Sequence, residues 1–162
     1  MAKSDFENLR WYNLNHLLAL GFGSGLAPKA PGTFGTLAAI PFFLLMSGLT
    51  PTSYALLVVF SFIIGIWVCH KTSEDMGSHD HGSIVWDEFV GFWITMFMVP
   101  VSLTSVVLGF ALFRLFDVWK PWPIALVDRK VGGGFGIMID DVIAGIFAAI
   151  SLQLILRLPY FS

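Results

Sequence analysis

Acidic side chains occur as adjacent pairs at two places in this chain, Asp87–Glu88 and Asp140–Asp141, each beside an apolar segment. We expect both pairs at the start of a helix. Adjacent carboxylates repel each other and are costly to desolvate next to hydrocarbon. Such oxygen ligands suit a hard divalent cation, because Mg²⁺ binds one or two protein carboxylates together with phosphate oxygens and water. The alternative is that these acids only stabilise helix N-termini, where the helix dipole favours negative charge.

Asp117 and Lys120 form a second candidate group at the end of another apolar segment. If the helix extends to Lys120, their three-residue spacing puts both side chains on one face, although Pro121 must end that helix soon afterwards. A lysine beside a metal site can bind phosphate as a point charge. The alternative is that Lys120 anchors the protein to anionic lipid head groups.

Glycine-rich segments provide candidate phosphate contacts without forming a P-loop, because none continues into Gly-Lys-Ser/Thr. Gly32 and Thr33 directly precede an apolar helix, and free backbone N–H groups at a helix start can hold phosphate. Lys29 lies close by in the sequence. The structural alternative is that Thr33 is a plain N-cap.

Other catalytic patterns are weak or missing from the sequence. His79-Asp80-His81 resembles a metal ligand group, but no second cluster and no His-Glu-x-x-His accompanies it, so Asp80 fits better as a member of the acidic set. Cys69 is not followed by the arginine of thiol phosphatases, and no Gly-x-Ser-x-Gly occurs. These absences favour metal-assisted attack by water over covalent catalysis.

The composition indicates a membrane protein. The 162 residues are 56% hydrophobic and only 12% charged, with a mean hydropathy of +0.79, whereas about 25% charged residues is typical of soluble domains. The net charge of −2 offers no basic surface for nucleic acid. We expect a single domain over residues 1–162. The apolar runs cover residues 34–49, 53–69, 84–116 and 142–158.

Pro100 is expected to divide the third run into two helices. The chain is therefore predicted to be all-α, a multi-helical integral membrane protein with about five short apolar helices and tight hairpins near Pro51 and Pro100. Sixteen residues cover roughly 24 Å, so each helix would span about 30 Å of hydrocarbon only marginally. The weaker apolar stretch at residues 16–26 is expected to be interfacial or re-entrant.

The distribution of charge predicts which polar segments face the cytoplasm. With residues 1–33, 70–83 and 117–141 inside, together with the charged helix ends beside them, Arg157 alone of the nine Lys and Arg residues falls outside. The positive-inside rule therefore orients these segments toward the cytoplasm. All eleven acidic residues fall on that same side, so we expect the active site to face the cytoplasm.

Five motifs in this order resemble the phosphatidylglycerophosphatase A family, over roughly residues 14 to 150. They are Gly21-Phe22-Gly23-Ser24-Gly25-Leu26-Ala27-Pro28, Ala30-Pro31-Gly32-Thr33, Asp80-His81-Gly82-Ser83-Ile84-Val85-Trp86-Asp87-Glu88, Phe116-Asp117-Val118-Trp119-Lys120-Pro121 and Gly136-Ile137-Met138-Ile139-Asp140-Asp141-Val142-Ile143-Ala144-Gly145. The stretch 75–81 is similar to the gamma-proteobacterial branch.

The resemblance implies a bacterial inner-membrane enzyme that hydrolyses phosphatidylglycerophosphate to phosphatidylglycerol and inorganic phosphate and depends on Mg²⁺. It also implies the functional residues Asp80, Asp87, Glu88, Asp117, Lys120, Asp140 and Asp141. We assign the catalytic role to all of these except Asp80, and metal binding to Asp80, Asp87, Glu88, Asp140 and Asp141. Phosphate contacts are assigned to Lys29, Gly32, Thr33 and Lys120.

The expected partners are the lipid substrate and surrounding membrane lipids, with the oligomeric state left open. Two other classes of function stay open from the residues. A cation-coupled transporter also needs membrane carboxylates, but near the middle of its spans. An assembly factor needs no acidic group at all.

Overall fold

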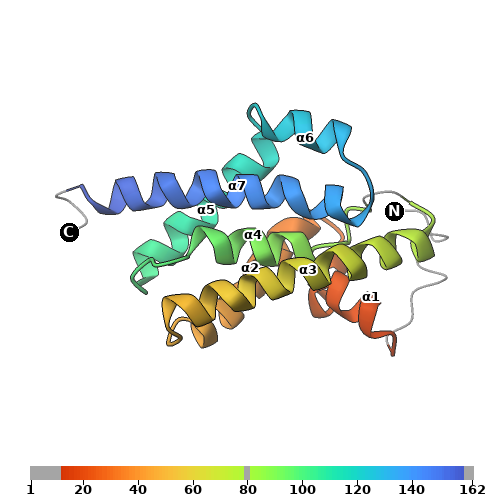
Figure 1. Cartoon of the computed structure of the whole chain (residues 1–162), viewed down its shortest axis with the longest axis horizontal. Helices are drawn as coiled ribbons and strands as arrows, with labels where there is room; N and C mark the ends of the chain where they lie inside the picture. The colour runs from red at the N-terminus through yellow and green to blue at the C-terminus, as the bar shows by residue number, and fades with distance from the viewer. Residues whose placement is uncertain (1–11, 79–80, 159–162) are drawn as a thin grey trace.

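The computed structural model describes residues 12–78 and 81–158, and every regular element in these two ranges is a helix. Four helices are long, and Figure 1 shows α7, α4 and α3 one beside the other in the same view. The long helices are α2 (Pro31–Met46), α3 (Pro51–Met76), α5 (Leu103–Trp119) and α7 (Gly133–Leu156). The short elements are α1 (Leu14–Ala19), a 3₁₀-helix (Gly21–Leu26), α4 (Trp86–Thr95) and α6 (Ile124–Lys130).

Helix α4 is the centre of the bundle and contacts all four long helices. Its apolar side chains are buried except for Ile94, which is partly buried, as expected for a helix at the centre of a bundle. The indole N–H of Trp86 donates to the Ser61 carbonyl of α3 at 3.1 Å, and that of Trp93 donates to the Ala39 carbonyl of α2 at 3.1 Å. These bonds satisfy the polar end of each buried ring. They also fix the N-terminus of α4, with Asp87 and Glu88, relative to α2 and α3.

Helices α4 and α7 approach each other through two glycines. A Cβ atom on Gly145 would lie 2.5 Å from the Gly91 carbonyl oxygen, and one on Gly91 would lie 2.9 Å from the Asp141 carbonyl oxygen. No larger residue fits such a contact without displacing one helix. This close packing brings the part of α7 that carries Asp141 against α4.

The position of the second acidic pair differs from the prediction. Helix α7 begins at Gly133, so Asp140 and Asp141 lie about two turns inside it rather than at its start. Glycine is a weak helix former, yet Gly133 and Gly134 belong to the first turn of α7. Gly134 packs against Ile66 of α3, and this tertiary contact outweighs the local propensity.

The prediction that every apolar helix is short is wrong for α3 and α7. Their 26 and 24 residues correspond to about 39 and 36 Å. Both are long and apolar enough to cross a membrane, judged by length and composition. The run 84–116 divides between α4, which ends at Thr95, and α5, which begins at Leu103. Helix α6 was not predicted.

Candidate functional site

Three carboxylates from two helices converge in the interior. Asp87 and Glu88 belong to the first turn of α4, and Asp141 belongs to α7. One oxygen from each side chain lies within 4.8 Å of the others, and we call these three residues the carboxylate cluster. Asp87 and Asp141 are buried. Three acidic groups this close repel one another when ionised, so the arrangement favours a cation between them.

Two oxygens of the carboxylate cluster indicate whether its residues fit a bound cation. Glu88 Oε2 and Asp141 Oδ2 are buried and have no hydrogen-bond partner among the described residues. An unsatisfied buried acceptor costs about 1–3 kcal/mol, and more when charged. A hard divalent cation would satisfy both oxygens and favour the ionised carboxylates, so the donor set fits such an ion.

Arg114 of α5 joins the carboxylate cluster to Asp117. Its Nη1 lies 3.6 Å from Glu88 Oε1 and also donates a hydrogen bond to Asp117 Oδ2. Asp117 is near the end of α5, as expected, and lies within hydrogen-bonding reach of Asp141. Asp117 is therefore beside the cluster without being part of it. Arg114 was absent from the predicted site, although its three-residue spacing from Asp117 was a usable signal.

Lys120 has different partners from those its spacing suggested. Helix α5 ends at Trp119, and Lys120 follows it in the left-handed conformation with φ +45°. Its Nζ donates to Asp128 Oδ1 of α6 and to Asp140 Oδ2 of α7, both at 2.7 Å. Burial alone would lower the pKa of Lys120, but these two bonds raise it above its ordinary value. Asp140, a predicted metal ligand, is thus bound by a lysine and lies outside the three-residue cluster.

Asp128 was not among the predicted residues. Asp128 lies beside Lys120 because α6 packs against α7. No local pattern in the sequence predicts that packing. Asp80, predicted as a metal ligand, lies outside the described residues.

The residues predicted to contact phosphate near the start of α2 differ in burial and in hydrogen bonding. Gly32 is buried at the start of α2, and a Cβ atom there would overlap Glu88 Oε1 and lie 2.9 Å from Arg114 Nη1. The Thr33 N–H is already used, since it donates to the Ala30 carbonyl at 2.9 Å. Ala30 occupies the N-cap position, so the alternative that Thr33 is the N-cap is wrong. Lys29 is exposed, and within the described ranges it has no ion pair.

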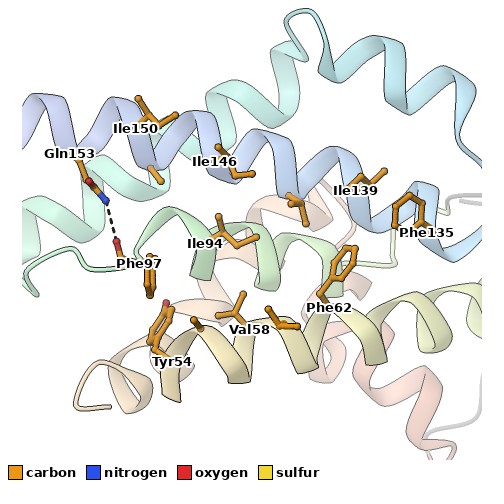
Figure 2. Close-up of a pocket in the computed structure, with 14 residues that line it drawn as sticks. Tyr54, Val58, Phe62, Ile94, Phe97, Phe135, Ile139, Ile146, Ile150 and Gln153 are labelled. Carbon is orange, nitrogen blue, oxygen red and sulfur yellow. Dashed lines mark hydrogen bonds between the residues drawn. The ribbon is translucent and has the colours of Figure 1, made fainter. Parts of the chain in front are cut away.

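A separate apolar groove of about 550 Å³ lies between α3, α4 and α7. Figure 2 shows Phe62 and Phe135 at one end and Tyr54 and Gln153 at the other. Both polar groups at that second end are engaged within the protein: the Tyr54 hydroxyl donates to the Trp93 carbonyl, and the Gln153 amide donates to the Phe97 carbonyl. The carboxylate cluster does not line this groove. The carboxylate cluster and this apolar groove are therefore different places in the molecule.

A helical bundle with buried carboxylates suited to a divalent cation is the class of protein that this fold and site define. The family model of phosphatidylglycerophosphatase A matches residues 17–156, and the chain belongs to this family. It is 55% identical to phosphatidylglycerophosphatase A of Escherichia coli (strain K12) over 150 residues, covering 92% of this chain and 86% of the relative.

Two further relatives are similar over most of their length. Phosphatidylglycerophosphatase A of Haemophilus influenzae is 52% identical over 137 residues, covering 83% of this chain and 84% of the relative. A protein named putative phosphatidylinositol-3-phosphatase, from Bacteroides thetaiotaomicron, is 41% identical over 143 residues, covering 83% and 88%. No solved structure is significantly similar to this chain.

Proposed function

We propose that this protein hydrolyses phosphatidylglycerophosphate to phosphatidylglycerol and inorganic phosphate, with Mg²⁺ as its cofactor. Family membership and the names of the relatives from Escherichia coli and Haemophilus influenzae support the phosphatase activity. The observation that carries the chemical part is the carboxylate cluster, in which Glu88 and Asp141 each have a buried oxygen without a hydrogen-bond partner among the described residues. Such oxygens are the ligands that Mg²⁺ prefers.

In this proposal Asp87, Glu88 and Asp141 hold the cation. When bound, Mg²⁺ would offset negative charge on the phosphate and favour attack by water. Arg114 keeps Glu88 in place through their ion pair. Asp117 is our candidate general base because it lies beside Asp141 without belonging to the cluster. It would accept a proton from the attacking water as the water oxygen bonds to phosphorus and the ester bond breaks, and the departing lipid oxygen would take a proton from solvent to become the alcohol.

Lys120 binds a phosphate oxygen in this scheme. Its ammonium group is next to Asp140, which precedes Asp141 of the cluster in the sequence. Backbone at Gly32 is the second candidate contact, because Gly32 packs directly on Glu88 and Arg114. Thr33 is a weaker candidate, since its N–H is bonded to Ala30, and exposed Lys29 would have to reach the phosphate from outside the bundle. Asp80 and Asp140 remain predicted metal ligands, and the carboxylate cluster includes neither of them.

The proposed location is the bacterial inner membrane, with several spans that include α3 and α7. Helix α3 carries a stripe of large apolar side chains that are each more than half exposed, namely Leu56, Phe60, Ile63 and Trp67. Their spacing places them on one helix face. A contiguous exposed apolar stripe of this kind is expected where a protein meets lipid or a partner, and the apolar length of α3 favours lipid.

We propose that the corner between α5 and α6 lies at the cytoplasmic membrane surface. Trp119 and Trp122 are strongly exposed there, and tryptophan is enriched where the bilayer meets water. Arg129 and Lys130 at the end of α6 are exposed as well. Exposed basic residues beside a membrane attract anionic lipid head groups. This corner also contains Lys120, so the site would open toward the cytoplasm.

The test is release of inorganic phosphate from phosphatidylglycerophosphate by the purified protein in mild detergent. We expect release with Mg²⁺, loss of release with excess EDTA, and recovery when Mg²⁺ is added back. Phosphate release that continues in EDTA would contradict the metal-dependent mechanism. If the folded protein released no phosphate under any of these conditions, the enzyme assignment itself would fail.

A further inference from the structure

A network of three charged side chains connects α5, α6 and α7. Lys120 Nζ lies 2.7 Å from Asp128 Oδ1 and 2.7 Å from Asp140 Oδ2. The Asp140 side chain is 9% exposed and that of Asp128 is 33% exposed. The function proposed above uses Lys120 and leaves Asp128 without a role.

This network differs from an ordinary surface ion pair. An exposed lysine–carboxylate pair contributes little, because water and salt compete for both charges. Lys120 is instead partly buried and bound by two carboxylates that come from different helices. Its backbone also has φ +45°, a conformation that residues other than glycine adopt rarely and that is found often at functional sites. The chain therefore holds this one ammonium group at a defined position.

The number of N–H donors on Lys120 shows how many remain for a ligand once Asp128 and Asp140 are bound. An ammonium group carries three N–H donors on a flexible four-carbon stem. Asp128 and Asp140 engage two of them, which leaves one donor for a phosphate oxygen. If only Asp140 held the ammonium group, its nitrogen would be free to rotate around that single contact.

We infer that Asp128 is a positioning residue: it holds the Lys120 ammonium group so that its third donor faces the phosphate of a lipid phosphomonoester bound at the carboxylate cluster. This inference rests on the proposed function. It differs from a competing arrangement in which Asp128 occupies the place of the phosphate and must be displaced by substrate. The two predict opposite changes in KM when the charge of Asp128 is removed.

The experiment compares Asp128→Asn with the wild type in kcat and KM for phosphatidylglycerophosphate in mixed micelles containing Mg²⁺. We expect KM to rise about tenfold, the size of effect seen when a residue that orients an active-site ligand is lost. The change in kcat should be smaller. Asp128→Glu, which keeps the charge, should restore part of the affinity. Inorganic phosphate, used as a competing inhibitor, should bind correspondingly more weakly to Asp128→Asn.

Glu74→Gln is the matched control. Glu74 pairs with Lys71 at 2.8 Å within α3, so this variant also removes a carboxylate from a lysine pair but is away from the carboxylate cluster. Its KM should equal that of the wild type. In a Lys120→Met background, Asp128→Asn should have no further effect on KM, because the group it positions is gone.

An unchanged KM in folded Asp128→Asn would overturn the inference, and a lower KM would do so in favour of the displaced-carboxylate arrangement. If Asp128→Asn does not stay folded, Asp128→Ser gives the same comparison. A wild type that releases no phosphate would instead contradict the proposed function, so the two failures are distinguishable.

Discussion

Helix α7 has two surfaces of opposite character. One includes Asp141, which is buried and meets Asp87 and Glu88 of α4 in the carboxylate cluster. The other includes Ile146 and Ile150, which line the apolar groove in Figure 2. On the first surface the acidic groups are buried and have few hydrogen-bond donors around them. On the second surface the side chains are apolar and need no hydrogen-bond partner. The comparison shows that one helix carries part of the carboxylate cluster on one side and lines an apolar groove with another.

The first way to test this separation is to remove one charge from the cluster. Asp141→Asn and Glu88→Gln keep the side-chain shape but weaken cation binding, which is worth several kcal/mol in metal-assisted reactions. We expect phosphate release to fall by at least about 100-fold in each variant. Because each change relieves repulsion in metal-free protein, thermal unfolding in EDTA should not occur at a lower temperature. Full activity in both variants would remove the cluster from the mechanism.

The second prediction concerns the contact that brings the two helices together. Gly145→Ala places a methyl group against the Gly91 carbonyl, so α4 and α7 must separate. Overpacking of this kind costs about 1–3 kcal/mol, and we expect a matching loss in the free energy of unfolding together with a several-fold loss of activity. Gly48→Ala is the control, since a Cβ atom at that position meets nothing within 4 Å. Equal unfolding of the two variants in detergent would show that this contact tolerates expansion.

The smallest effect is expected in the apolar groove. Ile146 is 44% exposed, so Ile146→Ala loses only part of the roughly 1.5–3 kcal/mol that full burial of such a side chain contributes. Phosphate release should stay within about twofold of the wild type, because Ile146 does not line the carboxylate cluster. Substitutions away from such a site usually have small effects. A loss as large as that of Asp141→Asn would mean that groove and cluster act together.

Features that depend on neighbouring residues in the sequence could be predicted. Asp87 and Glu88 do stand in the first turn of a helix, and Asp117 does lie near the end of another. The helical character of the described residues follows from long apolar runs, and the family resemblance from motifs in order is confirmed. Each of these rests on local composition or spacing.

Features that depend on packing between distant segments could not be predicted. Asp140 and Asp141 are inside α7 because Gly134 packs on Ile66, a contact between residues far apart in the sequence. The partners of Lys120 are Asp128 and Asp140 rather than Asp117, because α5 ends at Trp119 and α6 packs against α7. Such pairings are decided by tertiary structure, and spacing along one helix carries no information about them.

The shortness of α4 has a consequence for the membrane in which we place the protein. Its ten residues cover about 15 Å, half of a hydrocarbon core of about 30 Å. Beyond the carboxylate cluster most of its side chains are apolar and buried, including Phe89, Val90 and Phe92. Packed apolar side chains therefore adjoin the carboxylate cluster along α4. In the membrane location proposed above, such packing would keep ions and water that reach the carboxylate cluster from crossing to the other side of the bilayer, so the membrane would keep its electrochemical gradient.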